Sequence, residues 1–374
     1  MFSRTHRLGT TIGTVSAQES CPIFLSRSRP PSPHASSSTS TKRKRAFHTF
    51  KGKTAVAKYR RLGHFGGTKM TGIGVVVTVL MWSTLATSVD LLHGAPTLFV
   101  NGVALTIGGI IGLPWVRHWK MPLALVLAGS GLMFAYHVIY FYALQLGDPI
   151  GVSLVHYLWP IIIVCLTARM APPEQKPRFL LASALLGFGG AAAACWSVQE
   201  PLLSHDGPAS MSSHVIREVV AYLLALLSAF AWAAYSVLGK RFNSLSSLSV
   251  GAFSLPAGLA CLAMYFCTSD WPRLSAQDWL VLVYMGLGPM GTAFYLWDFA
   301  MKKGNTGLTA ALSYATPVLS TIFLALHSAH PLPATLWLGV AMVTASVVMV
   351  RARRGTRMTK SSAEAPSSVS AVNR

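Results

Sequence analysis

The sequence predicts an all-α polytopic membrane protein in which ten transmembrane helices form two inverted five-helix repeats. The first observation is composition, because hydrophobic residues make up 52% of the chain, charged residues only 11%, and the mean hydropathy is +0.49. Soluble domains carry about 25% charged residues. The second observation is that residues 71–351 form a series of apolar segments separated by short polar connections. The third is an internal repeat.

The internal repeat relates residues 123–160 to residues 280–317, which align without a gap at a spacing of 157 positions. Ten of the 38 positions are identical, and because several are Gly, Pro or Tyr, shared hydrophobicity alone does not explain the match. A duplicated helical bundle is typical of secondary transporters, and an odd number of helices per copy gives the copies opposite orientations. The identical positions of the first copy are Leu123, Leu125, Val126, Gly129, Gly131, Met133, Ala143, Gly147, Tyr157 and Pro160.

Five predicted helices lie in the first half, each having roughly the 20 mostly apolar residues that span a bilayer. The first ends before Asp90, the second before Arg117, and the fifth contains a Gly- and Ala-rich run suited to close helix packing. The third and fourth are divided only by Gly147-Asp148-Pro149, which predicts a tight turn. In order, the helices are Thr71–Val89, Thr97–Val116, Pro122–Leu146, Gly151–Thr167 and Phe179–Val198.

Five further helices are predicted in the second half by the same length rule. The sixth is followed by Lys240 and Arg241, and the tenth by Arg351. The eighth and ninth are joined at residues 302–305, and this joint also predicts a tight turn. In order, these helices are Val219–Leu238, Leu248–Cys267, Trp279–Met301, Leu308–Leu326 and Leu332–Val350.

The loop charges predict that both termini are cytoplasmic, because cytoplasmic loops carry an excess of Lys and Arg. With the N-terminus placed inside, the outer connections receive only Arg217 and Arg273. The net charge of +20 is therefore interpreted as loops and tails facing an anionic membrane leaflet, and no nucleic-acid partner is expected. The inner connections and C-terminal tail receive Arg117, Lys120, Arg169, Lys176, Arg178, Lys240, Arg241, Lys302, Lys303, Arg351, Arg353, Arg354, Arg357 and Lys360.

The predicted domain boundaries follow from these segments. Residues 70–198 form the first five-helix repeat, 199–218 an external loop, 219–351 the second repeat, and 352–374 a cytoplasmic tail. Residues 1–69 form a basic, Ser- and Arg-rich disordered extension without the apolar core of a secretory signal peptide. An overlong gene model that truly starts at Met70 and an organelle transit peptide are the alternatives, and the first of these or a disordered tail is favoured over the second.

Two matched prolines, Pro160 and Pro317, lie near the middle of the fourth and ninth helices. A proline lacks the N–H that would bond the carbonyl four residues earlier, so the carbonyls of His156 and Ser313 lose their helical partners. Unpaired backbone groups at membrane depth must face protein or a polar cavity. The prolines are therefore hinge candidates beside a substrate site, while a packing kink is the alternative.

Aromatic side chains with polar atoms gather around these prolines. A buried indole or phenol needs a partner for its polar atom, and a shared, partly wet cavity would satisfy several of them and offer ring faces to a flat or cationic ligand. Ordinary packing explains any one of these residues, whereas the group as a whole favours a cavity. The group consists of Trp82, Tyr136, Tyr140, Tyr157, Trp159, Trp232, Tyr235 and Tyr314, and His156 is added because it adjoins the kink.

Charged and titratable residues within the predicted helices are few. Asp298 and Lys302 are four residues apart near a cytoplasmic helix end, which predicts an ion pair rather than a proton-carrying site. His156 could sense protons or bind substrate, and a structural histidine is the equal alternative. No hydrolase, phosphate-binding or paired-carboxylate motif is present, so the sequence predicts no enzyme, no cofactor and no metal site.

Four segments carry a resemblance to a known family, namely Leu80–Thr84, Val152–Pro160, Ser228–Phe242 and Leu312–Thr321. They resemble the EamA-type members of the drug/metabolite transporter superfamily, and within it the aromatic amino acid exporters of bacterial inner membranes. The resemblance implies two inverted five-helix repeats, alternating access, and a central cavity lined by Trp82, Tyr136, Tyr140, Tyr157, Trp159 and Trp232. One departure is His156, which stands where that group more often has Asn.

We therefore expect a multi-pass protein of a bacterial inner membrane that exports amino acids, above all the aromatic ones, as its small-molecule substrates. Another small metabolite or drug is the alternative cargo. A membrane receptor or scaffold that does not transport is the alternative from a different functional class. The sequence does not define an oligomeric state.

Overall fold

The computed structural model describes residues 70–92, 94–168, 177–196, 208–327 and 334–363. Within these ranges the regular secondary structure is entirely helical, which confirms the predicted all-α class. The predicted extension over residues 1–69 lies outside the described residues, as do parts of the predicted external loop and of the tail. Among the described residues, eight helices are long and apolar enough to cross a membrane, and two shorter apolar helices are Thr97–Ile111 and Arg178–Ala194.

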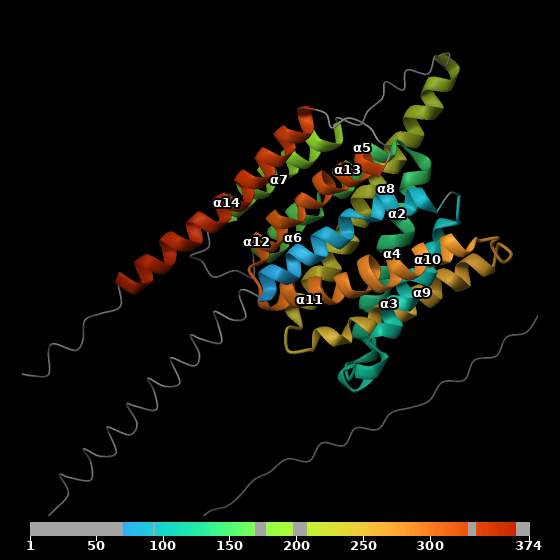
Figure 1. Ribbon diagram of the computed structural model, residues 1–374, viewed down its shortest axis with the longest axis horizontal. Coiled ribbons are helices and arrows are strands. Elements are labelled where there is room, and N and C mark those ends of the chain that lie inside the picture. The colour runs from blue at the N-terminus through green and yellow to red at the C-terminus, as the bar shows by residue number, and fades with distance from the viewer. Residues whose placement is uncertain (1–69, 93, 169–176, 197–207, 328–333, 364–374) are drawn as a thin grey trace, which may run out of the picture. The chain divides into compact units, whose positions relative to one another are not determined.

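The helices of the first half follow the predicted segments (Figure 1). The second segment differs, because its α-helix ends at Ile111 and a 3₁₀ turn with Pro114 in its first positions follows. The elements are residues 70–83, α2 (Leu85–Leu91), α3 (Thr97–Ile111), η1 (Leu113–His118), α4 (Leu123–Leu146), α5 (Pro149–His156), α6 (Trp159–Ala168) and α7 (Pro177–Trp196).

The helices of the second half include two that exceed the predicted lengths. α8 begins at Pro208, inside the stretch predicted as an external loop, and α14 continues to Ala363, inside the predicted tail. The elements are α8 (Pro208–Arg241), η2 (Ser247–Val250), α9 (Gly251–Phe266), α10 (Ala276–Leu287), η3 (Gly288–Thr292), α11 (Ala293–Lys303), α12 (Thr306–Ser313), α13 (Ala315–His327) and α14 (Ala334–Ala363).

The two predicted tight turns have the same construction. Gly147 ends α4 and Gly304 ends α11, both in extended backbone with ψ of -177 and -176. The next residue then caps the following helix: an Asp148 carboxylate oxygen accepts from the Gly151 N–H at 2.6 Å, and the Asn305 side-chain oxygen accepts from the Leu308 N–H at 2.9 Å. Each cap satisfies a backbone donor that the first helical turn leaves unpaired.

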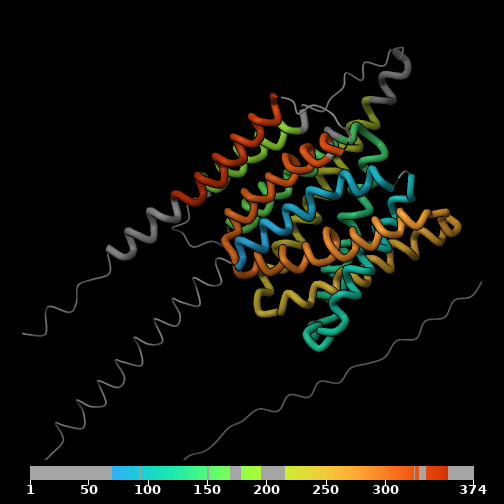
Figure 2. The backbone as a smooth tube through the Cα atoms, in the orientation of Figure 1, coloured from blue at the N-terminus to red at the C-terminus, as the bar shows by residue number. Residues whose placement is uncertain are grey.

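Helices from the two halves pack against each other in pairs. α3 packs on α9, α6 on α12, and α7 on α14, the last pair running side by side at one edge of the bundle (Figure 1). Small residues allow the closest approaches. A Cβ on Gly109 of α3 would lie 2.6 Å from the Cα atom of Leu255 in α9. Figure 2 shows the first helix, in blue, alongside the orange segment α10–η3–α11. The two are joined by a hydrogen bond that the Thr78 hydroxyl donates to the Ala293 carbonyl at 3.3 Å.

Besides a turn at Thr84 in the first helix, three interruptions of regular helix lie within the described long helices. The helix containing Pro160 breaks at residues 157–158, and the helix containing Pro317 breaks at Tyr314. Both breaks fall just before the proline, where its missing N–H weakens the helix. The third interruption is the π-helical segment η3, a form that occurs mostly as short insertions at functional sites.

The surface of the bundle is strongly apolar. Leu123 and Leu280, which are repeat counterparts, are 70% and 71% exposed. Many other large apolar side chains on the helices are exposed as well. Soluble monomers rarely expose such extensive apolar surface, so this surface is suited to contact with lipid.

Candidate functional site

A cavity of about 650 Å³ lies inside the helical bundle. Its walls come from the first helix, α4, the α5–α6 break, α8, the η3 region and α13, so helices of both halves contribute. Most of the wall is aromatic or apolar, with a few hydroxyl groups from Ser153 and from α13. The sequence-predicted residues that line it are Trp82, Tyr136, Tyr140, His156, Tyr157, Trp159, Trp232 and Pro317.

Four tryptophans pack together at the cavity. The ring centroid of Trp82 lies 5.2 Å from that of Trp297, 5.6 Å from Trp232 and 6.3 Å from Trp159. Trp82 donates its indole N–H to the Pro289 carbonyl of η3 at 3.0 Å, and Trp297 donates to the Ser236 hydroxyl at 3.0 Å. These bonds fix the two rings, because each polar atom has a buried partner.

A second aromatic group joins α4 to α5. The His156 ring lies 4.2 Å from the Tyr140 ring and 5.3 Å from the Tyr136 ring, measured between centroids. Tyr136 and Tyr140 stack on each other at 6.2 Å, as their spacing of four residues on one helix face predicts. The Tyr140 hydroxyl also lies 3.1 Å from the Ser153 hydroxyl.

The structure does not bring three sequence-predicted site residues to the cavity. Tyr235 is buried behind Trp232, with the two rings stacked at 5.4 Å. Tyr314 is fully buried beside Phe188 and Gly187. Pro160 is buried within α6 and does not line the cavity, unlike its counterpart Pro317.

Sequence reasoning missed several lining residues, among them Phe294, His137, Thr316 and Asp90. The repeat contained a signal for two of them. Phe294 is the counterpart of His137 at the 157-residue spacing, and Thr316 is the counterpart of the predicted Trp159. Asp90 was interpreted only as a helix end.

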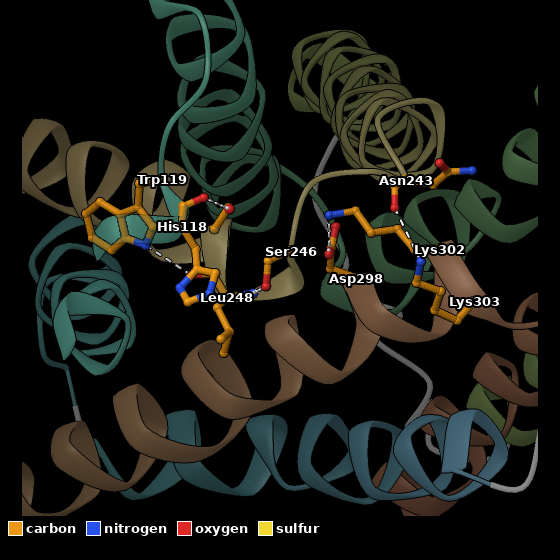
Figure 3. A network of polar contacts seen from close by, with 9 residues as sticks. His118, Trp119, Asn243, Ser246, Leu248, Asp298, Lys302 and Lys303 are labelled. Atoms are coloured by element: carbon orange, nitrogen blue, oxygen red, sulfur yellow. Dashed lines mark hydrogen bonds and ion pairs between the residues drawn. The ribbon is translucent and has the colours of Figure 1, made fainter. Parts of the chain in front are cut away.

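A polar network joins the ends of α8, η2, α11 and the η1 region (Figure 3). Asp298 pairs with Lys302 at 2.7 Å, which confirms the predicted ion pair, and both side chains are only 4% exposed. Lys303 donates to the Asn243 carbonyl at 3.4 Å, and the Trp119 indole donates to the Leu248 carbonyl at 3.0 Å. These contacts hold the helix ends together on the side that the loop charges predict to be cytoplasmic.

In the part of the chain that the structure describes, no group of three or more His, Cys, Asp or Glu residues is arranged to hold a metal ion. The two cavity histidines are instead held by hydrogen bonds. His137 Nδ1 lies 2.7 Å from the Met133 carbonyl, and His156 Nδ1 lies 2.9 Å from the Ser228 hydroxyl.

An apolar-surfaced bundle of membrane-length helices around an aromatic cavity is typical of multi-pass membrane proteins, transporters among them. Comparison with known proteins agrees, because residues 219–352 match the EamA-like transporter family. The chain is also 33% identical to "Aromatic amino acid exporter YddG" of Ancylobacter novellus over 287 residues, which cover 74% of this chain and 96% of that protein. The chain belongs to the EamA-like transporter family, which confirms the resemblance found in the sequence.

Further similarities agree with this assignment. The proteins named aromatic amino acid exporter YddG from Salmonella typhimurium and Escherichia coli are 30% and 28% identical, with 74% and 77% of this chain and 94% and 99% of those proteins covered. A crystal structure of a protein 30% identical in sequence aligns with a TM-score of 0.66, covering 75% of this chain and 97% of that one. The family indicates a small-molecule cargo and a membrane environment rather than an enzyme.

Proposed function

We propose that this protein exports aromatic amino acids across a bacterial inner membrane by alternating access. The observation that carries the proposal is the cavity, whose volume of about 650 Å³ is within the range of small-molecule sites and whose walls contain many aromatic side chains. Aromatic rings pack favourably on other rings in offset or edge-to-face geometry. The names of the three similar exporters support the same class of cargo.

The proposed architecture is ten membrane-spanning helices in two inverted repeats, residues 70–198 and 219–351. It is supported by the 157-residue spacing and by the identically built turns at Gly147 and Gly304. It is also supported by the packing of counterpart helices, α3 with α9 and α7 with α14, and by the contact of α6 with α12, which belong to the counterpart fourth and ninth helices. The loop charges support cytoplasmic termini.

In the proposed cycle, the repeats rock about the cavity, which is the usual mode of inverted-repeat transporters. The lining reaches Asp90 and Pro149 at helix ends that the topology places outside. At the opposite ends, α8 contacts α11 closely, because Lys240 donates to the Met301 carbonyl at 3.3 Å and Gly239 lies against Asp298. The conformation is therefore interpreted as facing outward, with the cytoplasmic side closed. The breaks beside Pro160 and Pro317 are the proposed flex points.

Efflux from proteoliposomes tests this function. Vesicles containing the purified protein are loaded with labelled phenylalanine, tyrosine or tryptophan, and loss of label is compared with empty vesicles. We expect protein-dependent efflux, and we expect Trp232→Ala to reduce it while Trp337→Ala, which changes a 59% exposed indole, leaves it unchanged. Absence of efflux for all three amino acids would remove the aromatic claim.

A further inference from the structure

The cavity is electron-rich. Among the described residues that line it, none is Lys or Arg, and the one carboxylate is that of Asp90 at a helix end. The wall also contains many aromatic rings, and the faces of such rings carry partial negative charge and attract cations. A substrate carboxylate therefore meets no cationic side chain here, although an amino acid carries a carboxylate and an ammonium group together.

The hydrogen bonds of His156 fix which ring nitrogen carries the proton. Its Nδ1 atom lies 2.9 Å from the Ser228 oxygen, and the Ser228 hydroxyl donates its own hydrogen to the Ala225 carbonyl at 2.7 Å. The Ser228 oxygen must then accept from His156, so Nδ1 is the donor. In a neutral imidazole the other nitrogen, Nε2, is an acceptor.

His137 has the same arrangement. Its Nδ1 atom lies 2.7 Å from the Met133 carbonyl, which can only accept, so Nδ1 again donates and Nε2 is left as an acceptor. Both histidines line the cavity and are 2% and 5% exposed. Beside the neutral hydroxyl groups of the wall, two acceptor nitrogens, aromatic rings and one carboxylate favour groups that donate hydrogen bonds or carry positive charge.

We infer that the cavity recognises the ring and the amino group of its substrate and does not require the carboxylate. Its substrates then include aromatic amines that lack a carboxylate, and they exclude aromatic carboxylic acids that lack the amine. This inference rests on the proposed function and assigns the chemistry of the same site. His156 is the specificity-determining residue, because its ring lies against those of Tyr136 and Tyr140 and its Nδ1 atom is held by Ser228 of α8, which leaves Nε2 as the acceptor.

Burial energetics favour the amine. A carboxylate moved from water into a site that offers neutral hydroxyl groups and no cationic side chain loses much of its hydration, which is costly. An ammonium group in the same site gains cation–π contacts and a charge-assisted hydrogen bond. Removing the carboxylate from phenylalanine should therefore cost little, whereas removing the amine should cost most of the recognition.

Binding to the purified full-length protein in lipid nanodiscs, measured by calorimetry, tests this directly. Phenethylamine keeps the ring and amine of phenylalanine, and hydrocinnamate keeps the ring and carboxylate. We expect phenethylamine to bind within about threefold of phenylalanine and hydrocinnamate to bind about tenfold more weakly or worse, as expected for one charge-assisted hydrogen bond. Hydrocinnamate that binds as well as phenylalanine, or phenethylamine that does not bind, would overturn the inference.

Two substitutions at His156 isolate the acceptor nitrogen. The amide of His156→Asn reaches the position of Nδ1 and can keep the Ser228 contact, but nothing replaces Nε2. The longer His156→Gln side chain reaches the position of Nε2. We expect the Asn variant to bind phenethylamine about tenfold more weakly and the Gln variant to stay within about threefold. Equal losses in both variants would assign His156 a merely structural role and contradict the inference.

His118→Asn is the matched control, because His118 lies in η1, outside the cavity, and its side chain contacts only the Trp115 carbonyl among the hydrogen bonds that the structure describes. It should bind all three compounds like the unaltered protein. The efflux assay separates this inference from the proposed function. Amine-selective binding without phenylalanine efflux removes the export claim alone, and efflux with equal binding of hydrocinnamate removes the recognition claim alone.

Discussion

At the scale of single residues, the Asp298–Lys302 pair is unusual for its burial. The two side chains are each 4% exposed and 2.7 Å apart. The other Asp298 oxygen lies so close to α8 that a Cβ on Gly239 would be 2.6 Å from it. Asp298 therefore lies against α8, while its ion pair with Lys302 is made within α11, and a buried pair of this kind is stable only while both charges are present.

Neutralising one partner of this pair should be strongly destabilising. Because the remaining charge would be buried without a counter-charge, we expect Asp298→Asn to lower the free energy of unfolding by about 3–5 kcal/mol. The double variant Asp298→Asn with Lys302→Gln should lose less than the sum of the two single variants. Chemical denaturation in detergent micelles measures the free energy of unfolding of the unaltered protein, the two single variants and the double variant. Strictly additive losses would show that the two residues are not coupled.

The membership of the cavity was predictable in part. Trp82, Trp159, Trp232 and the α4 tyrosines were identifiable because indoles and phenols are rare in the middle of a membrane. Tyr235 and Tyr314 share that chemistry but are rotated away, and helix rotation depends on packing that residue types do not reveal. Phe294 was missed because a phenylalanine in an apolar helix has no distinguishing chemistry, although the repeat relates it to His137.

At the scale of elements, the α3–α9 contact depends on Gly109. A Cβ at this position would meet the Leu255 backbone at 2.6 Å, so the helices must separate to accept Gly109→Ala. We expect a loss of about 1–3 kcal/mol in stability, typical of overpacking. Gly72→Ala is the control, since a Cβ there has no atom within 4 Å. Thermal unfolding in detergent compares the midpoint temperatures of the two variants. Equal midpoint temperatures would contradict the close contact between α3 and α9.

The helix breaks make a second prediction at this scale. Pro317→Ala restores a backbone N–H at the break beside the cavity, and a straighter helix should slow the proposed rocking while substrate still binds. We expect efflux to fall about tenfold, equivalent to about 1.4 kcal/mol on the transport barrier. Pro256→Ala is the control, because Pro256 lies inside α9 and does not line the cavity. Loss of binding together with efflux would show that Pro317 has a structural rather than a hinge role.

Hydropathy predicted the position of the long helices well but not their internal irregularities. The π-helical segment η3 was not foreseen, because it depends on contacts such as the Trp82 indole on the Pro289 carbonyl and the Thr292 hydroxyl on the Leu287 carbonyl. The first part of α8, before residue 219, was assigned to a loop because it is polar. The length of an apolar segment predicts the part of a helix that lies in lipid, but it does not predict polar helical extensions beyond the lipid.

At the scale of the whole molecule, the proposed topology can be tested without a structure. Cysteine labels placed in the α4–α5 turn and in the α11–α12 turn should react with a membrane-impermeant reagent from opposite sides of the membrane. Labels at the two chain ends should both react from the cytoplasmic side, because the loops with excess Lys and Arg are retained there. Reaction of both turns from the same side would exclude inverted repeats.

The paired turns also suggest how such a protein could have arisen. Gly147-Asp148 and Gly304-Asn305 keep one backbone shape, yet two lysines stand beside the second turn, whereas Glu218 accepts a hydrogen bond from Asp148 beside the first. The charge of the flanks therefore differs between the two turns, while the backbone geometry is the same. A newly copied half could reverse its direction of insertion through a few codon changes while its scaffold stayed intact.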